Sequence, residues 1–252
     1  MDIWMLPLLA LAGVLAGWLN VLAGGGSMVS VLAMLFMGIP GPIANGTFRV
    51  AILAQNFTAV TSFRQRGFSD FRLSLSLAAA ASVGAVAGAM VGVQLSGLWF
   101  NRALGLVMVG VLVLMATDWG RATPQPAKET PGGPKNLVLG HILMVGAGLW
   151  GGFIQIGVGF IFMPILARVM GIDLVRVNMH KVFIVMVYTS IALLVFASQG
   201  GVLWSAGLAL AFGHAIGAWL GVRSAVLKGD KLIRRVFMLM ISALVVKLLF
   251  FP

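Results

Sequence analysis

The sequence predicts an all-α integral membrane protein built as an inverted-topology repeat, and three observations lead to this prediction. Of the 252 residues, 60% are hydrophobic and only 9% are charged, whereas soluble domains carry about 25% charged residues. The apolar residues gather in stretches of about 20, the length that a helix needs to cross ~30 Å of hydrocarbon. The two halves of the chain also align without a gap when one is shifted by 133 residues.

Glycine, proline and charged residues divide the chain into ten apolar segments, five in each half. The segments are Trp4–Leu22, Ser27–Met37, Thr47–Phe63, Leu73–Gln94, Leu98–Thr117, Leu137–Trp150, Phe160–Met170, Lys181–Ser198, Leu203–Val222 and Lys231–Phe251. Residues 1–117 form a first membrane repeat and residues 137–252 a second, inverted one. Residues 118–136 are polar and rich in Pro and Gly, which is typical of a flexible linker.

Ser27–Met37 and Phe160–Met170 are too short to cross the bilayer, because 11 residues of helix span only about 17 Å. We expect each to form a hairpin with the helix before it, followed by three further helices in each half, so that about 8–10 segments enter the membrane. Irregular backbone at membrane depth is tolerated only where protein buries it or water lines it. The two short segments therefore point to a site inside the bundle.

The 17 Lys and Arg residues outnumber the 6 Asp and Glu residues, giving a net charge of +11. All of these cations except Arg49, Arg102 and Lys247 lie in four regions, at residues 64–72, 121–135, 168–181 and 223–235. Cytoplasmic loops of membrane proteins carry such an excess, so we expect a multi-pass protein of the plasma (inner) membrane with a cytoplasmic linker and both termini extracytoplasmic. No segment joins a basic face to a soluble fold, so nucleic acid is not an expected partner.

The internal alignment pairs Gly26 with Gly159, Asn45 with Asn178 and Gly84 with Gly217. The basic loop at 64–72 pairs with the uncharged stretch at 197–205, which predicts opposite orientations for the two halves. Inverted repeats with broken helices are typical of secondary transporters, whose site lies at the repeat interface. The alternative is a duplicated membrane protein with only a structural role. On the first interpretation, the two repeats together form one transport domain.

Two matched glycine clusters precede the short segments. The first contains Gly24, Gly25, Gly26 and Ser27, and the second contains Gly157 and Gly159. Glycines let a ligand approach the backbone closely, and a helix N-terminus attracts anions. The alternative is that these glycines only allow helices to pack closely.

A second matched pair surrounds the two asparagines, which we expect to be N-caps of the following helices. The candidate binding residues here are Asn45, Gly46, Thr47 and Arg49 in the first half, and Asn178, His180 and Lys181 in the second. Two cations near helix starts could neutralise a small anionic substrate. Alternatively, each cation extends toward a nearby interface between membrane and water. For Arg49, which lies on the side poor in cations, binding is the favoured interpretation.

The sequence gives little support for catalysis or metal binding. The chain has no cysteine, no carboxylate in the middle of a span, and no motif for a nucleophilic triad, a metal or a nucleoside triphosphate. We therefore expect no enzyme activity, no cofactor and no metal. His214 lies within a span and is either a proton carrier or a structural histidine. A coupling proton or sodium ion, the direction of transport and the oligomeric state are left open by the sequence.

Two stretches carry a family resemblance: AGWLNVLAGGGSMVSVLAMLFMGIP and GAGLWGGFIQIGVGFIFMPILARVMGI, each followed by an Asn. They resemble the two repeats of the TauE/SafE sulfite exporter family. The resemblance covers nearly the whole chain except the linker. It implies a membrane permease for sulfite or an organosulfonate such as sulfoacetate. A small-carboxylate permease and an anion channel of the same fold are the alternatives.

Overall fold

The computed structural model describes residues 4–23, 26–94, 99, 102–103, 105–106, 109–110 and 134–225. Within these residues the secondary structure is helical, with no strand, as the sequence predicts. The helices are α1 (Met5–Ala23), α2 (Ser27–Phe36), α3 (Gly41–Gln65), α4 (Phe71–Gln94), α6 (Leu137–Phe153), α7 (Val158–Pro164), the π-helical turn η2 (Ile165–Val169), α8 (Leu174–Ser198) and α9 (Trp204–Ala225). The expected segment Lys231–Phe251, and most of Leu98–Thr117 and of the linker, lie outside the described residues.

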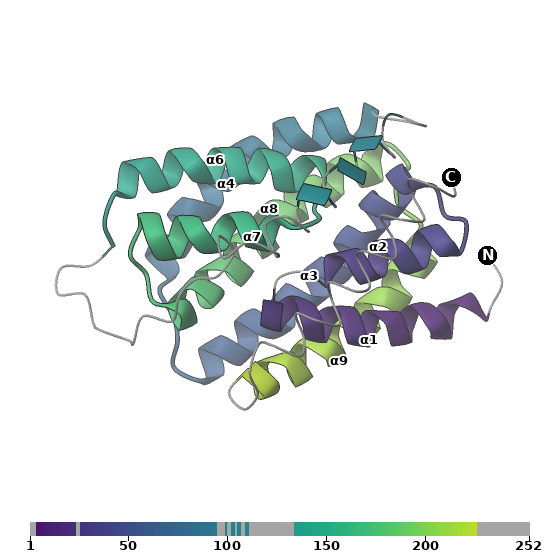
Figure 1. Cartoon of the computed structure of the whole chain (residues 1–252), viewed down its shortest axis with the longest axis horizontal. Helices are drawn as coiled ribbons and strands as arrows, with labels where there is room; N and C mark the ends of the chain where they lie inside the picture. Colours follow the sequence, from purple (N-terminus) through teal and green to yellow (C-terminus); the bar gives the residue numbers. More distant parts are fainter. Residues whose placement is uncertain are drawn as a thin grey trace.

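The helices form two clusters (Figure 1). One contains α1, α2, α3 and α9, and the other contains α4, α6, α7 and α8. Each cluster therefore combines three helices of one half of the sequence with one helix of the other half. The main contact between the clusters is that of α3 with α8.

The helix bounds follow the repeat in the sequence. Helices α3 and α8 are both 25 residues long, and their first residues, Gly41 and Leu174, are 133 positions apart. The first residues of α4 and α9 have the same separation. Gly38 and Gly171, which end the two short-helix segments, have left-handed φ angles of 79° and 70°, a conformation that glycine adopts without strain.

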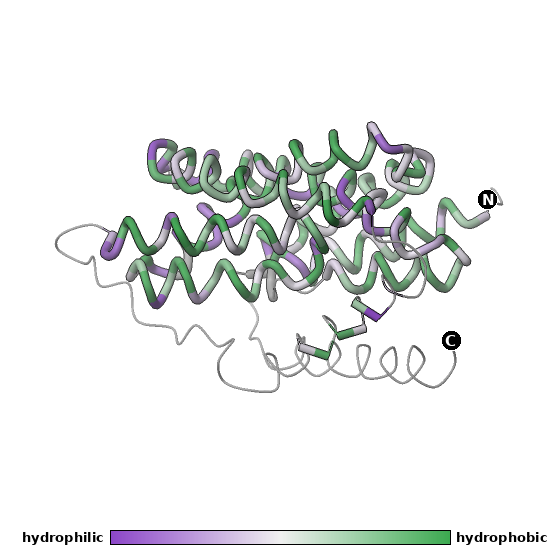
Figure 2. Tube along the Cα trace, turned by 90° about the horizontal axis from the view of Figure 1, so that it is seen from above, coloured by the Kyte–Doolittle hydropathy of each residue, from purple (hydrophilic) through white to green (hydrophobic). Residues whose placement is uncertain are grey.

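The outer surface of the bundle suits a lipid environment. Three helical stretches in the described residues, Phe71–Gln94, Arg176–Ser198 and Trp204–Arg223, are long and apolar enough to cross a membrane. Large apolar side chains such as Phe57 and Phe212 are exposed on the outside, and hydrophobic residues line most of the length of the helices (Figure 2). Contiguous exposed apolar surface of this kind marks contact with a membrane or another apolar partner.

Helices α3 and α8 begin about two turns earlier than the sequence predicts, which corrects the assignment of Asn45 and Asn178 as N-caps. Helix α3 starts after Pro40, and Asp173 accepts a hydrogen bond from the backbone N–H of Arg176 at the start of α8. Both asparagines lie inside their helices. The polar pair Asn45-Gly46 resembles a helix breaker in sequence, but tertiary contacts stabilise it within α3.

Glycines bring α4 and α6 into backbone contact. A Cβ atom on Gly148 would lie 1.9 Å from the carbonyl oxygen of Ala81, and one on Gly84 would lie 1.9 Å from that of Val145. The same arrangement recurs between α1 and α9, where a Cβ on Gly213 would lie 2.0 Å from the Ala10 oxygen. Small residues permit such close approach of membrane helices.

These contacts give a prediction with an internal control, because Gly146 and Gly148 lie two residues apart on α6. Gly148→Ala forces α4 and α6 apart and should destabilise the protein by about 1–3 kcal/mol or more. Gly146→Ala should be neutral, since nothing lies within 4 Å of its added Cβ. Thermal unfolding of both variants in detergent measures the difference; equal midpoints for the two would contradict the packing argument.

Candidate functional site

Helix α6 ends inside the bundle, and side chains of α3 satisfy its last carbonyl groups. Arg49 donates through Nη1 to the Gly151 oxygen at 3.0 Å and through Nη2 to the Gly152 oxygen. One turn earlier on α3, Asn45 Nδ2 donates to the Phe153 oxygen at 2.9 Å. The Trp150 oxygen accepts from the backbone N–H of Ile154. All four terminal carbonyls of α6, which a helix leaves without internal partners, are thereby bonded.

The Arg49 guanidinium is fully buried and is engaged on several sides. Besides the α6 carbonyls, Nη1 donates to Gln155 Oε1 at 3.2 Å, and the cation lies 4.4 Å from the centre of the Phe196 ring. The C-terminal end of a helix carries a partial negative charge, so α6 itself stabilises the buried cation. Arg49 therefore ties α3 to the elbow between α6 and α7.

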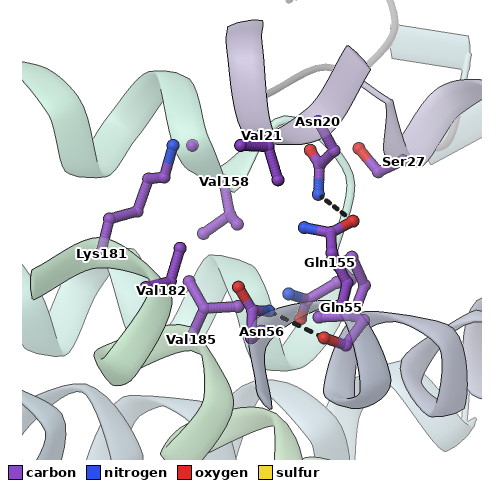
Figure 3. A pocket seen from close by; sticks show the side chains of 12 residues that line it. Asn20, Val21, Ser27, Gln55, Asn56, Gln155, Val158, Lys181, Val182 and Val185 are labelled. Carbon is purple, nitrogen blue, oxygen red and sulfur yellow. Dashed lines mark hydrogen bonds between the residues drawn. The ribbon is translucent and has the colours of Figure 1, made fainter. Parts of the chain in front are cut away.

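A small, partly open cavity of about 30 Å³ lies where the two hairpin elbows meet α3 and α8. Its wall contains residues of both halves: Asn20, Val21, Ser27, Ile52, Gln55, Asn56, Gln155, Val158, Gly159, Lys181, Val182 and Val185. Lys181 lies on one side of the cavity, and Asn20, Ser27, Gln55 and Gln155 lie on the other (Figure 3). A small polar space with a cation and several amides suits a compact polar ligand.

The cavity brings together three of the residues that the sequence proposed for binding, namely Ser27, Gly159 and Lys181. Arg49 and Asn178 lie behind the wall: Arg49 bonds to Gln155, and Asn178 accepts a hydrogen bond from Lys181 Nζ at 2.8 Å. Gly24 and Gly25 lie outside the described residues. The wall thus includes elements of both predicted clusters.

The remaining predicted residues make contacts elsewhere in the fold. A Cβ on Gly26 would lie 1.8 Å from the Ala16 oxygen, and one on Gly46 would lie 2.0 Å from the Gly201 oxygen, so both glycines permit close packing. Thr47 Oγ1 accepts from the Leu203 N–H at 2.9 Å, at the start of α9. His180 Nδ1 lies 2.8 Å from Ser74 Oγ on α4. Gly157 turns the chain into α7 with a φ of 74°.

Sequence reasoning did not place Asn20, Gln55, Asn56 and Gln155 at the site, although the structure puts all four in the cavity wall. The available signal was their polarity within otherwise apolar segments, which is equally typical of hydrogen bonds between helices. Gln55, Asn56 and Gln155 are each no more than 3% exposed. Asn56 also donates to the Ile52 oxygen and Gln155 to the Tyr188 hydroxyl, so these two amides hold the fold together as well as lining the cavity.

Lys181 is the cation of the cavity wall. It is 6% exposed, and its ammonium group donates to the amide oxygen of Asn178. Within the described ranges the acidic residues are Asp70 and Asp173, which accept hydrogen bonds from backbone N–H groups at the starts of α4 and α8 and do not line the cavity. A buried cation without a carboxylate beside it favours an anion in the adjoining space.

The described residues contain no cluster of His, Asp or Glu side chains that could hold a metal ion. The arrangement is instead that of a helical membrane protein with a small polar cavity at the seam between two helix clusters. The described wall of this cavity offers one cation and several amide groups to a ligand.

Comparison with known proteins agrees with this class. Residues 9–248 match the family model described as sulfite exporter TauE/SafE, and the chain belongs to this family. It is 28% identical to the probable membrane transporter protein ORF9 of a Sinorhizobium species, over 98% of this chain and 94% of the relative. It is 25% identical to the probable membrane transporter protein YfcA of Escherichia coli K12, over 98% and 90%. No solved structure matches significantly. The protein is thus a membrane transporter and not an enzyme.

The contacts of Arg49 predict that its loss affects the fold. Arg49→Ala leaves the Gly151 and Gly152 carbonyls without their partner, and each unsatisfied buried group costs about 1–3 kcal/mol. We expect a clearly lower midpoint of thermal unfolding in detergent, a smaller loss for Arg49→Lys, and none for Arg64→Ala, an exposed arginine on the same helix. An Arg49→Ala protein of normal stability that no longer transports would instead assign Arg49 directly to the substrate.

Proposed function

We propose that this protein is a secondary transporter that moves a small anion across the plasma membrane, with sulfite or an organosulfonate such as sulfoacetate as substrate. The observation that carries the proposal is the buried Lys181 at the wall of the cavity, with no carboxylate among the described residues of that wall. An anion that enters the cavity supplies the missing counter-charge. The family description as a sulfite exporter supports the same substrate class.

The dimensions of the cavity favour the smaller of these substrates. About 30 Å³ of free space is about the volume that one water molecule takes up in the liquid. A compact oxyanion such as sulfite requires less rearrangement of the wall than an elongated organosulfonate. The oxygen atoms of sulfite can accept hydrogen bonds from Lys181 and from the amide groups of the cavity, and charge-assisted bonds of this kind are stronger than neutral ones.

The proposal includes an inverted repeat formed by residues 1–117 and 137–252, with a cytoplasmic linker and extracytoplasmic termini. Two observations support it: the helix bounds that recur at 133 residues, and the way each cluster takes one helix from the other half. In such transporters the two repeats move against each other about a site between them. The seam between α3 and α8, where the cavity lies, is then the place where access changes sides.

The proposed orientation predicts the labelling of single cysteines, which the native chain lacks. Ser69 and Gln199 are exposed in the connections that follow α3 and α8. In intact cells or oriented vesicles, a membrane-impermeant thiol reagent should modify Ser69→Cys only from the cytoplasmic side and Gln199→Cys only from the outside. Labelling of both from one side would contradict the inverted arrangement.

The role of Lys181 is tested by sulfite binding, measured as the ligand-dependent rise of the unfolding temperature, and by sulfite uptake into proteoliposomes. Loss of one charge-assisted hydrogen bond, worth about 1.5–3 kcal/mol, should weaken binding roughly ten- to hundred-fold. We expect this loss for Lys181→Met, which keeps the length of the side chain, and partial binding for Lys181→Arg.

The control for this series is Lys135→Met, which removes an exposed lysine outside the cavity. It should bind and transport as the unaltered protein does. The same assay with sulfate, thiosulfate, sulfoacetate and simple carboxylates ranks the alternative substrates. A ligand that binds only the folded protein raises the apparent stability of that protein. Unchanged sulfite affinity in Lys181→Met would remove the observation on which the proposal rests.

A further inference from the structure

A continuous chain of buried hydrogen bonds connects α2, α9, α3 and α1 beside the cavity. Ser30 Oγ lies 2.7 Å from His214 Nε2, and His214 Nδ1 lies 2.9 Å from Gln55 Oε1. Asn20 Nδ2 donates to the same Gln55 oxygen at 3.0 Å. Ser30 and His214 are fully buried and Gln55 is 2% exposed. The chain ends at the cavity, whose wall contains Asn20 and Gln55.

The surrounding fold holds the His214 ring in place. The edge of the Phe48 ring approaches it, with ring centres 5.7 Å apart and planes at 64°. A Cβ on Gly17 would lie 2.5 Å from the backbone oxygen of His214, so a glycine at this position lets α1 reach α9. Asn20 follows one turn later on α1. The packing of α1 on α9 therefore places Asn20 and His214 on the same side of Gln55.

The hydrogen bonds define how the Gln55 amide is turned. The Gln55 oxygen can only accept hydrogen bonds, so both Asn20 and His214 must donate to it. The neutral His214 ring therefore carries its proton on Nδ1, and its Nε2 accepts from the Ser30 hydroxyl. Two donors then fix the oxygen away from the free space. Within the described residues the Gln55 amide nitrogen has no hydrogen-bond acceptor. In that part of the chain, the fully buried polar side-chain atoms without a partner are Asn45 Oδ1 and Arg49 Nε, so the Gln55 nitrogen retains some accessible surface. The remaining free surface beside Gln55 is the cavity.

We infer that Gln55 is a specificity-determining residue of the proposed anion site, with its amide N–H₂ directed into the cavity opposite Lys181, and that His214 is the positioning residue that fixes this direction. The inference rests on the proposed function and deepens it. The ligand class that fits a cation on one side and amide donors on the other is an oxyanion with several acceptor oxygens. A ligand that presents a cation or an N–H group finds no complementary partner in Gln55.

The tautomer of His214 tests the inference without any ligand. In protein labelled with ¹⁵N on the histidine rings, the nitrogen shifts distinguish the two neutral tautomers, and the His214→Asn spectrum identifies the His214 signals among those of His141 and His180. We expect the proton on Nδ1. A proton on Nε2 alone would overturn the inference, because Gln55 would then have to donate to His214 and turn its oxygen toward the cavity.

Sulfite binding to matched variants provides the second test. Gln55→Glu keeps the length of the side chain and an acceptor for Asn20 and His214, but it replaces the cavity-facing donor by a carboxylate oxygen; we expect at least a roughly tenfold loss of affinity. His214→Leu removes the donor that fixes the amide and should weaken binding about three- to tenfold. His214→Asn retains an amide donor at the place of Nδ1 and should restore most of the affinity.

The outcomes separate positioning from folding. Equal losses in His214→Leu and His214→Asn, measured well below both unfolding temperatures, would show that His214 acts only through the fold and would overturn its assigned role. Unchanged affinity in Gln55→Glu would overturn the role of Gln55. If Gln55→Glu yields no folded protein, the two His214 variants decide between these alternatives. If the unaltered protein binds no sulfite, the proposed substrate fails, whereas the tautomer measurement still decides the orientation of Gln55.

Discussion

The hydrocarbon core of a membrane supplies no water to satisfy polar groups, and the architecture of this protein depends on that constraint. Helix α6 ends within the bundle, where its last carbonyls would otherwise be unpaired. Asn45 and Arg49 of α3 bond to three of them. These bonds permit an elbow inside the bundle, and the elbow places Gln155 and Gly159 at the cavity wall. The pairing of the last carbonyl groups of α6 thereby shapes one part of the cavity wall.

Close packing of glycines determines how the two halves of the chain combine. Gly148 brings α6 against α4, and Gly213 brings α9 against α1, so that each half contributes one helix to the other cluster. Among the described residues the main contact between the clusters is that of α3 with α8, and the cavity lies along it. A site at such a seam receives side chains from both halves, and relative motion of the halves would change its access. In secondary transporters built from repeats, the site lies at such an interface between the repeats.

The two buried cations beside the cavity have different surroundings. Arg49 is held by the negative end of α6 and by the Phe196 ring. Among the described residues, Lys181 bonds through its side chain to the neutral amide of Asn178, so the protein balances its charge less than that of Arg49. The sequence favoured Arg49 for binding, because it lies on the predicted side that is poor in cations. The structure leaves Lys181 at the cavity wall and places Arg49 behind Gln155.

Hydropathy, segment length and glycine clusters are local properties of the chain, so the all-helical membrane class, the family and the two short helices could be predicted from the sequence. It also indicated Ser27, Gly159 and Lys181, which line the cavity. It placed the starts of α3 and α8 too late, because asparagine is typical of an N-cap. In the structure both asparagines lie inside their helices, and Asn45 bonds to the Phe153 oxygen of α6. Only the tertiary structure assigned Gln55 and Gln155 to the cavity and Arg49 to α6. The partner of a buried polar group is chosen by whichever distant segment packs against it, and for Arg49 that segment lies about a hundred residues away.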